Sequence, residues 1–174
     1  MSVVKGPGDA QAFEKRFEEM VDQYQNALLR MCYIQLRDRS LAEDAVQETF
    51  IKAYRNLSAF EGKAGEKTWL MRITINTCRD MNRSGWMRLM DRRYTPDMLP
   101  EAAVPFEESE EELVLAVMQL PFKLREVILL YYYQGMNTMD IADSLGISQS
   151  SVSGRLKRAR DKMRISLEGR GFHE

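Results

Sequence analysis

Two short helical patterns adjoin in this chain, in Thr138-Met-Asp-Ile-Ala-Asp-Ser-Leu-Gly-Ile-Ser148 and in the following Gln149-Ser-Ser-Val-Ser-Gly-Arg-Leu-Lys-Arg-Ala-Arg160. The first carries an apolar stripe of Ile141, Ala142 and Leu145. Gly146 tolerates a tight turn, and the hydroxyl of Ser148 can accept from a free backbone N–H at the start of the second helix. The two patterns together predict a helix-turn-helix.

The second pattern has two different faces. Apolar residues recur at helical spacing at Val152, Leu156, Ala159 and Met163. The opposite face has short polar residues first and cations after them: Ser150, Ser151, Ser153, Gly154, Arg155, Lys157 and Arg158. Short side chains let a recognition helix approach base edges in the major groove, and cations suit the flanking phosphates. The alternative is an ordinary amphipathic helix with a solvated basic face.

Charge is segregated along the chain, although the formal net charge of the 174 residues is only −1. Such a total alone argues against a nucleic-acid-binding protein. Between Ser148 and Arg164, however, six basic residues accompany one acidic residue, Asp161, which leaves a net +5 on one helix. Acidic residues gather instead in Glu107-Glu-Ser-Glu-Glu-Glu112. This segregation indicates one surface for DNA and another for a different partner.

The composition argues against several classes of protein. With one histidine, His173, and no Gly-rich phosphate loop or nucleophile elbow, we expect no enzyme, no metal and no cofactor. No signal peptide is recognisable, and no apolar run approaches the ~20 residues that span a bilayer. Cys32 and Cys78 form no C-x-x-C pair. We therefore expect buried thiols in a reducing cytosol, with a redox role as the weaker alternative.

Helical periodicity elsewhere predicts an all-α fold of two small lobes joined by a flexible linker. In the N-terminal lobe, residues 10–84, the first helix has an apolar face of Phe13, Phe17, Met20, Val21, Tyr24, Leu28 and Met31. Ser40 with Glu43 forms a capping box for a second helix to about Asn56. Thr68 is the expected cap of a third helix, which ends near Arg83 and directs Trp69 into the core.

The linker is expected at residues 85–109, which contain three prolines, although the apolar residues near Trp86 could also form a docking segment. The C-terminal lobe, residues 110–168, is expected to have four helices that end with the helix-turn-helix. Its first helix would bury Leu113, Val117 and Leu120. Its second, after Pro121, would bury Val127, Ile128, Leu130 and Tyr131.

These motifs resemble those of bacterial extracytoplasmic-function (ECF) sigma factors of the sigma-70 family. Asp44-Ala-Val-Gln-Glu-Thr-Phe50 is similar to that family's core-polymerase-binding helix. A second group of residues resembles the family's −10 melting and recognition segment: Phe60, Gly62, Thr68-Trp-Leu70, Arg72-Ile73, Asn76, Asp80 and Arg83. A third group resembles the family's lobe that reads the −35 promoter element: Leu120-Pro121, Arg125, Ile141-Ala142, Leu145-Gly146, Ser148, Val152 and Arg158-Ala-Arg160. The resemblance covers about residues 20–83 and 113–164, in the family's order.

The resemblance implies a protein that binds core RNA polymerase and directs it to a subset of promoters. The implied core-binding residues are Asp44, Gln47, Glu48, Phe50 and Lys52, which would meet the clamp coiled coil of the largest subunit, with Phe50 as internal support. The implied −10 residues are Phe60, Lys63, Lys67, Trp69, Arg72, Asn76, Arg79 and Arg83. The implied −35 residues are Ser148, Ser150, Ser151, Ser153, Gly154, Arg155, Lys157 and Arg158. The alternative for the acidic face with Asp44 and Glu48 is that it is simply solvated and binds no partner.

The resemblance also implies further partners. These are promoter DNA, the flap of the second-largest polymerase subunit and a separate anti-sigma factor, with no small-molecule substrate. The protein would be cytoplasmic, or held by that factor at the inner face of the membrane. One departure stands out: Glu66 occupies a position where the family commonly has an aromatic residue, so the −10 base preference should differ, because flipped bases are usually held by stacking.

Two other classes of function compete with a sigma factor. A DNA-binding regulator of the response-regulator type needs a receiver half, and the N-terminal lobe lacks the alternation of strands and helices that such a half requires. An adaptor that binds polymerase or an anti-sigma factor without reading DNA would not need the basic face at Arg155 and Arg158.

Overall fold

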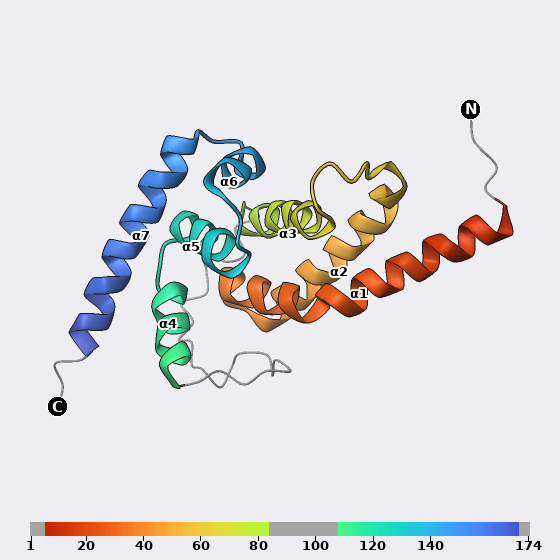
Figure 1. Ribbon diagram of the computed structural model, residues 1–174. Helices are drawn as coiled ribbons and strands as arrows, with labels where there is room; N and C mark the ends of the chain where they lie inside the picture. The colour runs from red at the N-terminus through yellow and green to blue at the C-terminus, as the bar shows by residue number, and fades with distance from the viewer. Residues whose placement is uncertain (1–5, 84–107, 171–174) are drawn as a thin grey trace.

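The computed structural model describes residues 6–83 and 108–170, and within these ranges it is helical with no strand (Figure 1). The N-terminal lobe comprises α1 (Pro7–Leu36), α2 (Arg39–Asn56), a short 3-10 turn (Leu57–Ala59) and α3 (Glu66–Arg83). The C-terminal lobe comprises α4 (Glu108–Met118), α5 (Phe122–Ile128) with a π-helical continuation (Leu129–Tyr133), α6 (Thr138–Leu145) and α7 (Gln149–Arg170). The all-α prediction is confirmed. The segment around Trp86 and most of the predicted linker lie outside the described residues.

Two helix starts in the N-terminal lobe differ from the sequence prediction. Asp38, not Ser40, caps α2, because its side chain accepts from the backbone N–H of Leu41 at 2.9 Å. α3 begins at Glu66, before the predicted cap Thr68, and its first turn is closed by the N–H of Trp69 donating to the carbonyl of Gly65. The predicted apolar face of α1 is confirmed: Met20, Leu28 and Met31 are buried and the rest of the face is partly buried.

The C-terminal lobe confirms the helix-turn-helix. Gly146 has φ +65° at the turn, and the hydroxyl of Ser148 accepts from the N–H of Ser151 at the start of α7. The apolar stripe of α7 is confirmed, with Val152, Leu156 and Ala159 buried and Met163 partly buried. Two predicted core residues are wrong. Leu113 is 41% exposed because α4 turns Val114, Val117 and Met118 inward, and Tyr131 lies at the surface.

The two lobes pack directly on one another through the C-terminal ends of α1 and α4. The guanidinium of Arg125 donates to the carbonyl of Gln35 through Nε at 3.1 Å and Nη2 at 2.7 Å. In the other direction, Arg37 Nη2 donates to the carbonyl of Leu120 at 2.8 Å. Carbonyls at a helix C-terminus lack intrahelical donors and carry partial negative charge, so a guanidinium from the opposite lobe satisfies them. We call this contact the interlobe seam.

Candidate polymerase- and DNA-binding surfaces

The outer face of α2 carries two of the predicted core-binding side chains. Asp44 and Gln47 are exposed and three residues apart, so they share one side of the helix. Phe50 is buried beneath them, as its predicted supporting role requires. Glu48 is partly exposed and pairs with Lys52 at 3.8 Å. The Lys52 side chain is 35% exposed, and its Nζ also donates to Thr77 Oγ1 of α3 at 3.2 Å, so it lies at the edge of this face toward α3.

Two exposed apolar residues on the same side of α2 were not predicted. Ile51 is 40% exposed and Tyr54 is 42% exposed. They border a shallow hollow of about 360 Å³, whose other walls include Phe17 of α1 and Gln47. Exposed apolar side chains beside acidic ones are typical of a protein interface. Sequence periodicity could have revealed them, since both positions fall on the helix side shared by Asp44 and Gln47.

The loop between α2 and α3 holds a pair of stacked aromatic rings. The ring centroids of Phe60 and Trp69 are 4.8 Å apart and their planes meet at 29°. Trp69 packs against the core but is only partly buried, so the prediction of a core tryptophan holds only in part. Lys63 is well exposed and pairs with Glu61 at 2.9 Å. The remaining exposed candidates along this surface are Lys67, Asn76 and Arg83.

Replacement of Trp69 with alanine should lower the free energy of unfolding by about 2 kcal/mol. Complete burial of such a ring would give ~3–5 kcal/mol, and part of this ring is exposed. Lys63→Ala should leave stability within about 0.5 kcal/mol, because its pair with Glu61 lies at the surface. Thermal unfolding followed by circular dichroism measures both. Equal stability of the two variants would contradict the support assigned to the Trp69 ring.

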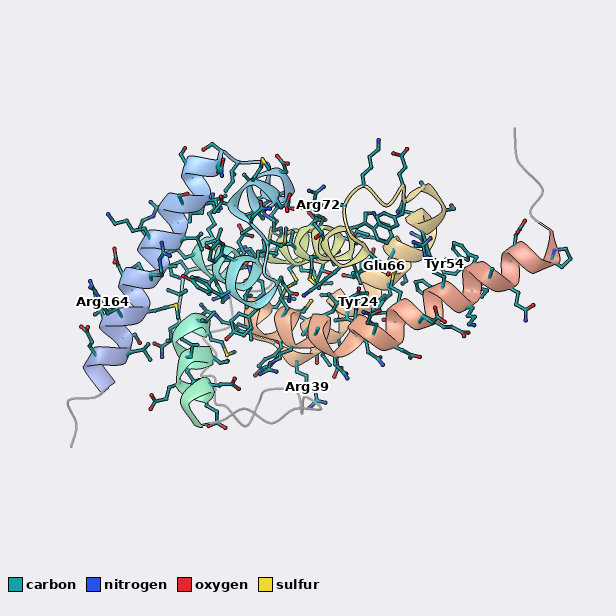
Figure 2. The ribbon with its side chains drawn as sticks, viewed as in Figure 1. Tyr24, Arg39, Tyr54, Glu66, Arg72 and Arg164 are labelled. Atoms are coloured by element: carbon teal, nitrogen blue, oxygen red, sulfur yellow. The ribbon has the colours of Figure 1, made fainter. Side chains whose placement is uncertain are left out.

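Two predicted −10 residues point toward the C-terminal lobe instead of into solvent. Arg72 Nε donates to Ser144 Oγ of α6 at 3.0 Å. Arg79 Nη1 donates to the carbonyl of Leu145 at 3.1 Å, at the end of the same helix. Both guanidiniums come from α3, so in this structure the cationic side of α3 faces the helix-turn-helix (Figure 2).

The predicted −35 residues lie along the first three turns of α7. Ser150, Ser151 and Ser153 are exposed, and the Ser148 hydroxyl lies 3.0 Å from that of Ser150 and 2.8 Å from that of Ser151. Gly154 is partly exposed. Lys157 and Arg158 are exposed. Arg155 differs from them, because its side chain is only 14% exposed and its Nη1 donates to Glu126 Oε1 at 3.3 Å.

Glu126 of α5 lies between the two predicted DNA-binding surfaces. Its side chain is fully buried, with Arg155 of α7 on one oxygen and Arg79 Nε 3.5 Å from the other. Burial raises the pKa of the Glu126 carboxyl above its ordinary value, and Arg79 and Arg155 lower it only in part. One buried carboxylate therefore holds a predicted −10 arginine and a predicted −35 arginine together.

The two cysteines meet in the core of the N-terminal lobe, with Cys78 Sγ 3.6 Å from Cys32 Sγ. Both are free thiols and both are buried, as predicted. The hydrogen bond from Cys78, and then burial, raise the pKa of the Cys32 thiol and so disfavour a reactive thiolate. Within residues 6–83 and 108–170, no three His, Cys, Asp or Glu side chains are arranged to hold a metal ion.

Two family models match the chain in succession. Residues 20–88 match sigma-70 region 2, and residues 110–163 match sigma-70 region 4. The first match contains α2, α3 and the stacked rings, and the second contains the helix-turn-helix. The matched regions thus coincide with the helices that carry the three sets of candidate residues.

Among curated proteins, the chain is 30% identical to the ECF RNA polymerase sigma factor SigW of Bacillus subtilis, over 95% of this chain and 92% of SigW. It is 31% identical to the RNA polymerase sigma-H factor of Pseudomonas aeruginosa, over 89% of this chain and 88% of that protein. Among solved structures, CnrH in complex with the cytosolic domain of CnrY has a TM-score of 0.66 at 30% identity, with 92% and 94% of the two chains covered. The sigma factor RpoE of Bartonella quintana, in complex with the anti-sigma factor NepR, has a TM-score of 0.72 at 23% identity, with 88% and 98% covered, and supports the fold.

Proposed function

Because this chain belongs to the extracytoplasmic-function sigma factors of the sigma-70 family, we propose that its α2 binds core RNA polymerase while α3 and α7 read the −10 and −35 promoter elements. The chain directs promoter-specific initiation by core polymerase, as its regions 2 and 4 and its relatives indicate. The proposal concerns which residues bind core polymerase and which read the two promoter elements. It rests most on the separation of an acidic and apolar face on α2 from a serine-rich and basic face on α7.

Core binding is assigned to Asp44 and Gln47, with Ile51 and Tyr54 as apolar neighbours. Carboxylate and amide groups on an exposed helix can pair with cations of the clamp coiled coil, and the charges set orientation and association rate. Apolar side chains at the centre of such a contact contribute most of the affinity once water is excluded. Phe50 acts from beneath by holding the shape of this face.

The −10 element is assigned to the surface around Phe60 and Trp69. Lys63 and Lys67 can neutralise phosphates of the separated strand, and the stacked rings form a firm apolar platform below them. The −35 element is assigned to the N-terminal turns of α7, where Ser151 and Ser153 leave space for the backbone to approach base edges. Lys157 and Arg158 follow along the helix, where their cations can contact the DNA phosphates.

Simultaneous reading of both elements requires the interlobe seam to open. Elements centred near −35 and −10 are separated by roughly 25 base pairs, or ~85 Å at ~3.4 Å per step. The whole of α7, with 22 residues, is only ~33 Å long. Lobes in direct contact therefore cannot reach both elements. Their separation would also release Arg72 and Arg79 of α3 from their contacts with α6 and Glu126, whereas Arg155 and Glu126 belong to the same lobe.

Transcription in vitro tests the proposed function. The full chain added to purified core polymerase should yield transcripts that start at a discrete promoter, whereas core enzyme alone should not. A DNA-binding regulator would bind the promoter and yield no transcript. An adaptor would bind core enzyme and leave it unable to select a start site. Either result would contradict the proposal.

The α7 assignment leads to a prediction that separates phosphate contacts from base contacts. Arg158→Ala should weaken binding to all −35 sequences alike and reduce the slope of log affinity against log salt by about one unit. Substitution of Ser151 or Ser153 should change the preferred sequence, at ~1–3 kcal/mol per altered position. A binding selection on randomised −35 elements measures both. A changed motif for Arg158→Ala with unchanged motifs for the serine variants would mean that another side of α7 faces the bases.

A separate anti-sigma factor is the further partner in this proposal. RpoE of Bartonella quintana was solved with the anti-sigma factor NepR, and it shares the fold of this chain. We place the protein in the cytoplasm, where polymerase and promoters are found, and assign it no enzymatic activity and no cofactor. In the described parts of the chain, every helix is too short or too polar to cross a membrane.

A further inference from the structure

Helix α1 begins well ahead of the region that matches sigma-70 region 2. The helix starts at Pro7, whereas the match starts at residue 20. Residues 7–19 therefore add ~20 Å of helix in front of the matched region. Figure 1 shows this part of α1 extending past the loop that joins α2 to α3. We call residues 7–19 the α1 extension.

The α1 extension is docked on α2 through aromatic contacts. Phe13 and Phe17 both meet the ring of Tyr54 edge to face, with centroid distances of 5.2 and 5.0 Å. Phe17 also meets Phe50 at 6.2 Å, and the hydroxyl of Tyr54 donates to Glu14 Oε1 at 2.6 Å. Edge-to-face pairs at these distances are attractive beyond their buried area. The extension therefore has a defined position along α2.

Arg16 reaches from this extension to the −10 surface itself. Its guanidinium carbon lies over the ring of Phe60, 5.7 Å from the centroid. Its Nε lies 3.9 Å from Glu66 Oε1, in the first turn of α3. Phe60 in turn is stacked on Trp69. A single side chain thus contacts both the aromatic platform and the carboxylate beside it.

A carboxylate in this position is unfavourable for DNA binding unless its charge is offset. Glu66 lies next to Lys67 in the chain, on a surface that must approach phosphates and bases. A negative charge there repels the phosphate backbone and weakens the effect of the neighbouring lysines. The charge of Glu66 also acts on α1: burial raises the pKa of Tyr24, and the negative charge of Glu66 raises it further. Both residues are labelled in Figure 2.

We propose that Arg16 is a positioning residue of the −10 surface, which offsets the charge of Glu66 and holds Phe60 against Trp69. It acts through these residues and need not touch DNA itself. The inference rests on the proposed function of the surface around Phe60 and Trp69. It assigns a role in promoter opening to a helical segment that lies outside the matched region 2.

Promoter opening by the full chain bound to core polymerase tests this role. A fluorescent base analogue in the −10 element reports strand separation after rapid mixing. Arg16→Ala should slow opening roughly threefold to tenfold, as expected for the loss of one exposed cation–π contact and one exposed ion pair. Arg16→Lys, which keeps the charge, should retain most of the rate. Lys15→Ala is the matched control, because Lys15 is exposed and pairs with Glu19 on the surface of the same helix at 4.0 Å. Its rate should stay within about twofold.

The same measurement in a Glu66→Gln background separates positioning from general support of the fold. With the carboxylate removed, Arg16→Ala should slow opening only about twofold, the part that belongs to Phe60. An equal loss in both backgrounds, or an equal loss for Lys15→Ala, would overturn the role of Arg16. If the wild-type protein bound to core polymerase opens no promoter, the proposed function is wrong, and this inference falls with it. The fluorescence measurement on the wild-type protein alone distinguishes that outcome from a failure of the role of Arg16.

Discussion

Replacement of Arg125 with methionine should lower the free energy of unfolding by about 3 kcal/mol. The side chain is almost completely buried and its guanidinium donates to three backbone carbonyls, those of Gln35, Met118 and Leu120. Methionine fills the space of the apolar stem but donates nothing, so these carbonyls lose a donor at ~1 kcal/mol or more each, although that of Leu120 keeps the hydrogen bond from Arg37. A loss of this size should lower the melting temperature by roughly 6–12 °C.

The same variant should loosen the interlobe seam, because two of the lost donors reach across it to the carbonyl of Gln35. Calorimetry measures the melting temperature, and small-angle scattering measures the radius of gyration, which should increase. Lys123→Met on the same helix is the control, since Lys123 is exposed. If Arg125→Met has the same melting temperature as that control and an unchanged radius of gyration, the interlobe seam does not depend on this guanidinium.

A second large effect is expected at the polymerase-binding face. The double variant Asp44→Lys, Gln47→Ala should weaken binding to core polymerase about a hundredfold or more, because a like charge placed against a basic partner costs several kcal/mol. Both side chains are exposed, so the fold should be unaffected. A titration of labelled protein with core enzyme gives the affinity.

Binding of the isolated protein to −35 DNA provides the internal check on this variant and should be unchanged. Asp22→Lys, a charge reversal at an exposed position of α1, is the matched control for altered net charge. Core affinity that falls equally in the control and in the double variant would indicate a general charge effect, and would remove Asp44 and Gln47 from the interface.

The sequence alone was sufficient where local periodicity and turn chemistry act without distant partners. The apolar stripe of α7, the left-handed Gly146 and the capping Ser148 all follow from rules that operate within a few residues. The buried support beneath the outer face of α2 was predicted in the same way, since Phe50 lies on the inner side of its helix. These local signals indicated the helical fold and the serine-rich and basic face of α7, whereas the core-binding and −10 residues came from the family resemblance.

Errors arose where two local signals competed. Asp38 and Ser40 can both cap a helix, and Asp38 does so because its own backbone is extended immediately before α2. Leu113 and Val114 are both apolar, and only the packing of α4 against its neighbours decides which of them is buried. A helical pattern specifies a stripe to within one residue, and tertiary contacts choose between neighbours.

Only the tertiary structure decided where the long cationic side chains point. In the sequence, Arg72, Arg79 and Arg155 are indistinguishable from exposed cations such as Lys157. In the folded chain, Arg72 and Arg79 bind Ser144 and the carbonyl of Leu145 of the opposite lobe. Arg155 binds the buried Glu126 within its own lobe. An arginine reaches several ångströms from its backbone, so its partner is set by whatever acceptor a distant segment brings within range, and periodicity carries no information about that segment.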